Sequence, residues 1–113
     1  MTVAAILYVL DADHGTKVGI TIQSVEQRVA DLARGAGFTP RVVATWPVEN
    51  AEHARRIEQL AHWLLRDTRT MGEWFHCHPV EAVAAVEKAM RGRGIYLEYQ
   101  RWLDAQPRGQ VAA

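Results

Sequence analysis

The side chains with the clearest chemical potential are Tyr8, Lys17, Arg28 and Glu58, which lie on four separate stretches of the chain. Together they offer a phenol that can lose a proton, two cations and a single carboxylate. Hydrolysis of a phosphodiester with one divalent metal ion needs groups of these kinds around one pocket. The hypothesis therefore depends on whether the fold brings four distant segments together.

The segments that carry these groups have recognisable structural signals. Residues 4–10 and 16–21 are short apolar or β-branched runs separated by a polar turn, which predicts a β-hairpin. Ser24 begins a capping-box signature, and apolar residues at helical spacing then predict a helix over 25–34. Residues 41–46 have strand propensity and stop at a proline, as expected for a third antiparallel strand.

The second half of the chain is dominated by helical patterns. Asn50 is a suitable N-cap for the longest helix, which we expect to run to about residue 67. A short extended segment over 72–76 precedes Pro79, which suits the first turn of another helix, and residues 95–103 are aromatic and helix-compatible. These signals predict an α/β (α+β) sandwich: a three-stranded antiparallel sheet flanked by helices, with an extra C-terminal helix.

The size of the chain suits one folded domain. Its 113 residues, of which 49% are apolar, can close one core and leave no room for a second domain of ordinary size. Within a single domain over 1–113 we expect a core over about 4–90, a helical extension over 91–106 and a disordered tail over 107–113.

The charge pattern limits the possible partners. Thirteen basic residues balance thirteen acidic ones, so no global positive field attracts phosphate backbones, and any nucleic-acid binding must be local or shared with a partner. No apolar run approaches the roughly 18 residues of a membrane span, and the first residues lack the charged start of a secretory signal. With a single cysteine, Cys77, these features predict a cytoplasmic protein without a membrane segment.

Four sequence motifs occur in a fixed order along the chain: Lys17-Val18-Gly19-Ile20-Thr21, Arg28, Glu58 with His62 four residues later, and Glu73-Trp74-Phe75. In this order they resemble the GIY-YIG nuclease superfamily, and most closely its small phage-type branch, named after an open reading frame of bacteriophage T5. The resemblance spans roughly residues 5–90. It implies a GIY-YIG-like fold and an endonuclease that hydrolyses DNA.

The resemblance also implies roles for individual residues. Tyr8 would remove a proton from the attacking water, and it needs neighbouring cations because a free phenol has a pKa near ~10. Lys17 stands where many relatives carry a second tyrosine, and its charge would assist Tyr8 or bind a phosphate oxygen. Arg28 lies at the margin of the buried helical stripe, and its planar guanidinium suits the scissile phosphate.

The remaining roles concern the predicted metal ion. Glu58 would hold Mg²⁺ or Mn²⁺, because Mg²⁺ needs only one or two protein carboxylates. His62, one helical turn after Glu58, would contact substrate phosphate or hold the carboxylate in place. Spacing assigns no chemical duty to Glu73, and the two aromatic residues that follow it are expected to be core rather than base-stacking groups.

A second interpretation keeps the scaffold without catalysis, as a nucleic-acid-binding or protein-interaction module of a phage or mobile element. The neutral net charge favours this view. The C-terminal arginines could contact a phosphate backbone, but Tyr96, Tyr99 and Trp102 among them suit a protein interface equally, including one with a second copy of the chain. Zinc binding by His76-Cys77-His78 is disfavoured because adjacent residues in an extended segment point to opposite sides.

Overall fold

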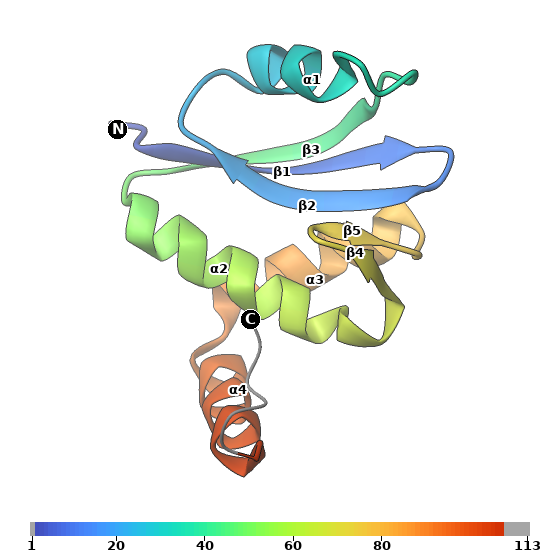
Figure 1. Ribbon diagram of the computed structural model, residues 1–113. Coiled ribbons are helices and arrows are strands. Elements are labelled where there is room, and N and C mark those ends of the chain that lie inside the picture. Colours follow the sequence, from blue (N-terminus) through green and yellow to red (C-terminus); the bar gives the residue numbers. More distant parts are fainter. Residues whose placement is uncertain (1, 108–113) are drawn as a thin grey trace.

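The computed structural model describes residues 2–107 and begins with the predicted β-hairpin (Figure 1). Strands β1 (Ala5–Ala12) and β2 (Gly15–Thr21) are antiparallel, with Tyr8 opposite Gly19. Strand β3 (Arg41–Val48) pairs antiparallel with the other side of β1. The three strands expected from the sequence are therefore present and adjacent.

The sheet nevertheless has five strands within the described residues, in the order β3-β1-β2-β5-β4, so the prediction of three was wrong. Strands β4 (Arg69–Met71) and β5 (Trp74–Phe75) form a small hairpin that turns at Gly72, where φ is +58°. This hairpin extends the sheet because β5 pairs with Thr16 and Lys17 of β2. Strands of two or three residues are too short to show an alternating pattern, which is why only part of this hairpin was anticipated.

Three helices begin where the sequence signals place them: α1 (Val25–Ala33), α2 (Ala51–Leu64), which is followed by a 3₁₀ turn at Arg66–Thr68, and α3 (Pro79–Arg91). Helix α4 (Arg93–Ala105) begins before the predicted aromatic segment and includes Gly94. The Ser24 hydroxyl accepts a hydrogen bond from the Gln27 amide at 3.1 Å. The Asn50 side chain likewise accepts from the first free amides of α2. These caps satisfy amides that have no partner within the helix.

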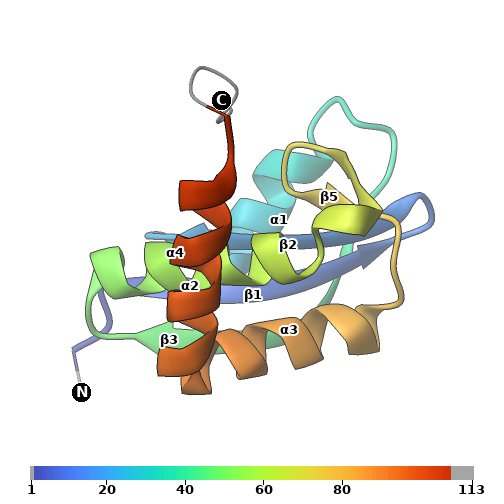
Figure 2. The ribbon, with the colours of Figure 1, turned by 90° about the horizontal axis from the view of Figure 1, so that it is seen from below.

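The sheet lies between two helical layers. Helix α1 covers one face, and α2 and α3 lie side by side on the other (Figures 1 and 2). Because side chains alternate along a strand, β1 contributes to two cores: Leu7 and Val9 pack towards α2 and α3, whereas Tyr8 and Leu10 pack towards α1. By the same alternation, Lys17 and Gly19 of β2 lie on the α1 face, because Val18 belongs to the opposite core.

Helix α4 projects from the end of α3, away from the sheet (Figure 1). It attaches to α2 through aromatic contacts, with the Trp63 ring centroid 5.7 Å from that of Tyr99 and 6.2 Å from that of Trp102. The predicted tail beyond Pro107 lies outside the described residues. In the part of the chain that the structure describes, every helix is too short or too polar to cross a bilayer.

Candidate active site at the open edge of strand β2

Tyr8 and Arg28 meet on the α1 face of the sheet. The Tyr8 side chain is fully buried in β1, and the Arg28 Nε of α1 donates a hydrogen bond to its hydroxyl at 3.4 Å. Burial raises the pKa of Tyr8, and although the hydrogen bond from Arg28 acts in the opposite direction, the balance lies above the ordinary value. The same hydrogen bond raises the pKa of Arg28. Tyr8 is therefore a protonated phenol held by a cation at neutral pH.

Gly19 provides the space in which two functional side chains converge. A Cβ atom added at this position would lie 2.6 Å from the Tyr8 hydroxyl oxygen and 2.8 Å from Oε1 of Glu73. Both distances are below ordinary van der Waals separation, so only glycine fits between these groups. Tyr8 and Glu73 thus approach the same point of the β2 backbone from different elements.

Lys17 has a different partner from the one expected. Its Nζ forms a salt bridge with Oε1 of Glu73 at 2.9 Å, and the exposed fraction of the lysine side chain is 7%. Glu73 lies in the turn between β4 and β5, and its backbone carbonyl accepts a hydrogen bond from the Val18 amide at 3.1 Å. The Glu-Trp-Phe motif drew attention to Glu73 in the sequence, but only the pairing of β5 with β2 brings the Glu73 carboxylate into the site.

The acid Glu58 reaches the site from the opposite helical layer, at the edge of β2. The Val18 amide points away from β1 because it bonds to Glu73, and the Ile20 amide two residues later points the same way. A backbone hydrogen bond from Ile20 favours the charged form of Glu58. One turn later on α2, the His62 Nε2 lies 2.8 Å from the Val18 carbonyl oxygen. Helix α2 therefore supplies polar partners to the edge of β2 that β5 leaves unpaired.

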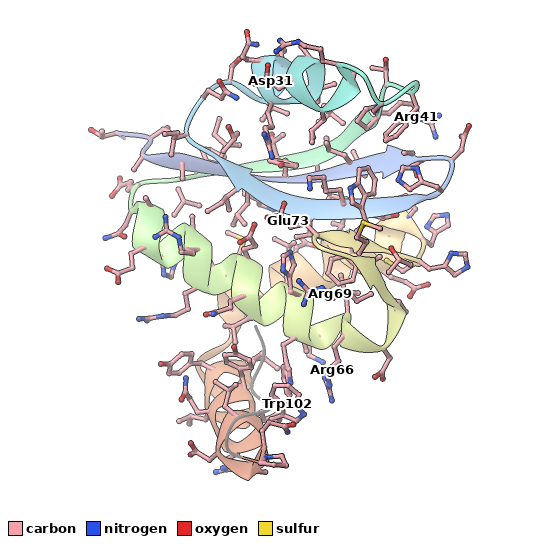
Figure 3. All side chains as sticks on the ribbon, in the orientation of Figure 1. Asp31, Arg41, Arg66, Arg69, Glu73 and Trp102 are labelled. Atoms are coloured by element: carbon pink, nitrogen blue, oxygen red, sulfur yellow. The ribbon has the colours of Figure 1, made fainter. Side chains whose placement is uncertain are left out.

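The Glu58 carboxyl group is the most perturbed acid of this cluster. Its pKa is raised to about 7, mainly by burial, then by the charge of Glu73 and by a side-chain hydrogen bond with Glu73, while Lys17 acts in the opposite direction. Its Oε2 is buried and has no hydrogen-bond partner among the described residues. Figure 3 labels Glu73, which lies at the edge of β2. A buried carboxylate oxygen without a partner, beside a second carboxylate, is a donor set that fits a divalent cation.

His62 has a structural role between α2 and the sheet. Its ring packs against Phe75 with centroids 5.1 Å apart, and burial lowers its pKa, so it is neutral near pH 7. Together with its contact to Val18, this packing attaches α2 to β2 and fixes the helical turn that carries Glu58. The structure thus places Tyr8, Lys17, Arg28 and Glu58 around one edge and gives His62 a supporting position.

The Lys17–Glu73 salt bridge is expected to contribute to the stability of the fold. Lys17→Met should lower the free energy of unfolding by about 1–3 kcal/mol, because Glu73 would keep its charge beside Glu58 without a cation; partial exposure of Glu73 reduces the effect. Arg41→Met is the matched control, since the Arg41–Asp11 pair is largely exposed on the arginine side and should contribute about 0–1 kcal/mol. Urea unfolding at pH 8 measures both, and equal losses would contradict the prediction.

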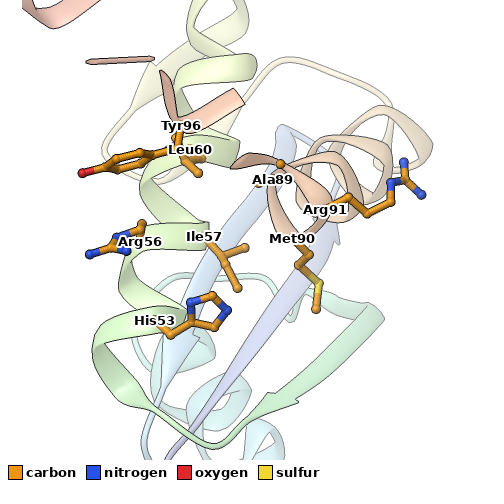
Figure 4. Close-up of a pocket in the computed structure, with 9 residues that line it drawn as sticks. His53, Arg56, Ile57, Leu60, Ala89, Met90, Arg91 and Tyr96 are labelled. Atoms are coloured by element: carbon orange, nitrogen blue, oxygen red, sulfur yellow. The ribbon is translucent and has the colours of Figure 1, made fainter. Parts of the chain in front are cut away.

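One hollow lies beside α2 and another lies at the end of β2, and the two differ in chemistry. A cavity of about 340 Å³ between α2, α3 and the start of α4 has Arg56 and Arg91 on opposite sides of an apolar floor (Figure 4). It contains no carboxylate and is therefore unsuited to a divalent cation. A smaller hollow of about 280 Å³ is lined by Arg28 and by the end of β2 with the residues that follow it. This smaller hollow adjoins the Tyr8–Arg28 pair.

Across residues 2–107, no group of three or more His, Cys, Asp or Glu side chains is arranged to hold a metal ion. The suitability of Glu58 for binding a divalent cation therefore rests on its own unpartnered oxygen and on the Glu73 carboxylate beside it.

Comparison with protein families completes the description of this site. The family model of the T5orf172 domain matches residues 5–91. The chain belongs to the T5orf172 domain family. This phage-type domain is commonly linked to nuclease or DNA-binding roles. The match extends from β1 to the end of α3, so every residue of the candidate site lies within the T5orf172 domain and α4 lies beyond it.

A search of curated proteins and a search of solved structures returned no match.

Proposed function

We propose that this T5orf172 domain is a GIY-YIG-type endonuclease that hydrolyses phosphodiester bonds of DNA with Mg²⁺ or Mn²⁺. One observation carries the proposal: the buried, unpartnered Oε2 of Glu58 lies at the edge of β2 where Tyr8, Arg28 and the Lys17–Glu73 pair also meet. An acid in this state is costly to a fold unless a ligand uses it. The family match supports a nucleic-acid substrate.

Each residue has a role that its surroundings favour. Glu58 would hold a divalent metal ion, which when bound would supply positive charge to the scissile phosphate and to the leaving oxygen. Arg28, which lines the smaller hollow, binds a phosphate oxygen and balances developing charge. Tyr8 can accept a proton from the attacking water only as its phenolate, so its own proton must first pass to solvent; the Arg28 cation favours this ionisation, whereas burial opposes it. Lys17 holds Glu73 beside Glu58 and limits the negative charge there.

Substitution of Arg28 provides the direct test of the proposed endonuclease activity. With supercoiled plasmid or branched DNA and Mg²⁺ or Mn²⁺, the wild-type chain should nick DNA, and chelation should stop the reaction. Arg28→Ala should reduce the initial cleavage rate by about 10²–10³-fold, as expected when a charged group in contact with the transition state is removed. Arg34→Ala is the matched control at the C-terminal end of the same helix, because Arg34 is exposed and pairs with Asp31; its rate should stay within about twofold of wild type.

The non-catalytic alternative gives a different result. A chain that binds DNA equally well with and without Arg28, and cleaves no substrate with either metal, would contradict the endonuclease and support a binding module.

A further inference from the structure

Three aromatic rings from distant parts of the sequence form a cluster beside the candidate site: His14, Phe38 and Trp74. The His14 centroid lies 4.7 Å from that of Phe38 and 4.4 Å from that of Trp74, and Phe38 and Trp74 are 6.0 Å apart. The rings come from the β1–β2 turn, the loop between α1 and β3, and strand β5. We call these residues the aromatic cluster.

The aromatic cluster lies on the surface rather than in either core. Phe38 is 37% exposed and His14 is exposed, whereas Phe75, the neighbour of Trp74, is completely buried. The loop before Phe38 contains Gly35 and Gly37 at φ values of +77° and +80°, and an added Cβ at either glycine would have no atom within 4 Å. Phe38 is therefore carried on an open loop, and its ring is available to a ligand.

The aromatic cluster is continuous with the proposed catalytic groups. The Lys17 Nζ lies 5.4 Å from the Trp74 ring centroid while it pairs with Glu73 at 2.9 Å. A DNA strand whose scissile phosphate lies at the edge of β2 would therefore have its neighbouring nucleotide near these rings.

We propose that the aromatic cluster binds unpaired bases of DNA next to the cleaved bond, so that the preferred substrates are single-stranded, branched or locally unpaired. This inference rests on the proposed function. Aromatic rings stack on any exposed base face, whereas the base faces of an intact duplex are covered by their neighbours. Because the chain has a net charge of zero, no global positive field attracts the phosphate backbone of a duplex, and base stacking supplies affinity in its place.

The test measures binding in the presence of EDTA, so that cleavage cannot occur. Fluorescence anisotropy is recorded with a labelled single-stranded oligonucleotide and with the same sequence fully paired. The wild-type chain should prefer the single strand. Phe38→Ala should weaken single-strand binding by about 5- to 150-fold, the effect of losing one stacked base, and should leave duplex binding unchanged. His14→Ala should act in the same direction, whereas Phe38→Tyr should retain affinity because a phenol ring also stacks.

Leu97→Ala is the matched control, because Leu97 is an exposed apolar residue on α4, away from the cluster. It should bind both DNAs as the wild type does. Equal wild-type affinity for the single strand and the duplex would overturn the proposal, as would unchanged binding by both Phe38→Ala and His14→Ala. A wild-type chain that prefers the single strand through Phe38 but never cleaves would support the aromatic cluster and contradict only the endonuclease.

Discussion

Replacing Glu58 with glutamine is expected to abolish metal-dependent cleavage and to stabilise the fold at alkaline pH. Glutamine keeps the shape of the side chain but has no negative charge with which to hold a divalent cation. The cleavage rate should fall by about a thousandfold or more, because several kcal/mol of charge stabilisation in the transition state would be lost.

The stability effect follows from the raised pKa of Glu58. Its pKa rises from 4.5 to about 7 on folding, so the folded state binds this proton more tightly than the unfolded state does. Below the lower value both states are protonated, and stability falls as the pH rises between the two values. Above about pH 7 the full cost of ionisation is present. Glu58→Gln removes that cost at pH 8 and has little effect on the stability of the fold at pH 4.

Partial exposure of Glu58 limits the gain to about 1–2 kcal/mol, which corresponds to a rise in Tm of several degrees. Thermal unfolding of the wild-type and variant chains at pH 4 and pH 8 measures it. Glu87→Gln, an exposed position on α3, is the matched control and should shift Tm little at either pH. The same Tm difference at both pH values would show that ionisation of Glu58 is not the cause, and retained cleavage would exclude Glu58 as the metal ligand.

Gly19→Ala is expected to damage both the fold and the site. The new Cβ would lie 2.6 Å from the Tyr8 hydroxyl oxygen and 2.7 Å from Tyr8 Cζ. Tyr8 is fully buried and cannot withdraw, so either its ring or the β2 backbone must move. We expect a loss of about 1–3 kcal/mol in the free energy of unfolding, as for other overpacked positions, and a fall of about 100-fold in cleavage rate as Tyr8 and Glu73 shift.

Gly94→Ala is the matched control for the change of glycine to alanine. Gly94 lies in α4, and an added Cβ there has no atom within 4 Å. The substitution should be neutral or stabilising by about 0.5–1 kcal/mol, because alanine loses less backbone entropy in a helix. Urea unfolding and initial cleavage rates distinguish the two positions. If Gly19→Ala proved as well tolerated as Gly94→Ala, the close approach of Tyr8 to β2 would not matter in solution.

The sequence by itself determined the elements that carry the site. The hairpin of β1 and β2 follows from two β-branched runs around a polar turn, and the starts of α1, α2 and α3 follow from Ser24, Asn50 and Pro79. These signals are local, since a cap or an alternating pattern acts within a few residues. The order of the motifs also indicated the phage-type T5orf172 branch, and the comparison then confirmed that branch.

The tertiary structure alone decided which charges meet. Lys17 was expected to assist Tyr8, but its partner is Glu73, which reaches it only because the short β4–β5 hairpin extends the sheet. Likewise, the raised pKa of Glu58 depends on burial against β2 and on the nearby Glu73 carboxylate. Ionisation and pairing are set by solvent exclusion and by neighbours from distant segments. No local pattern around Lys17 or Glu58 records those neighbours, so the sequence could name these residues but not their electrostatic state.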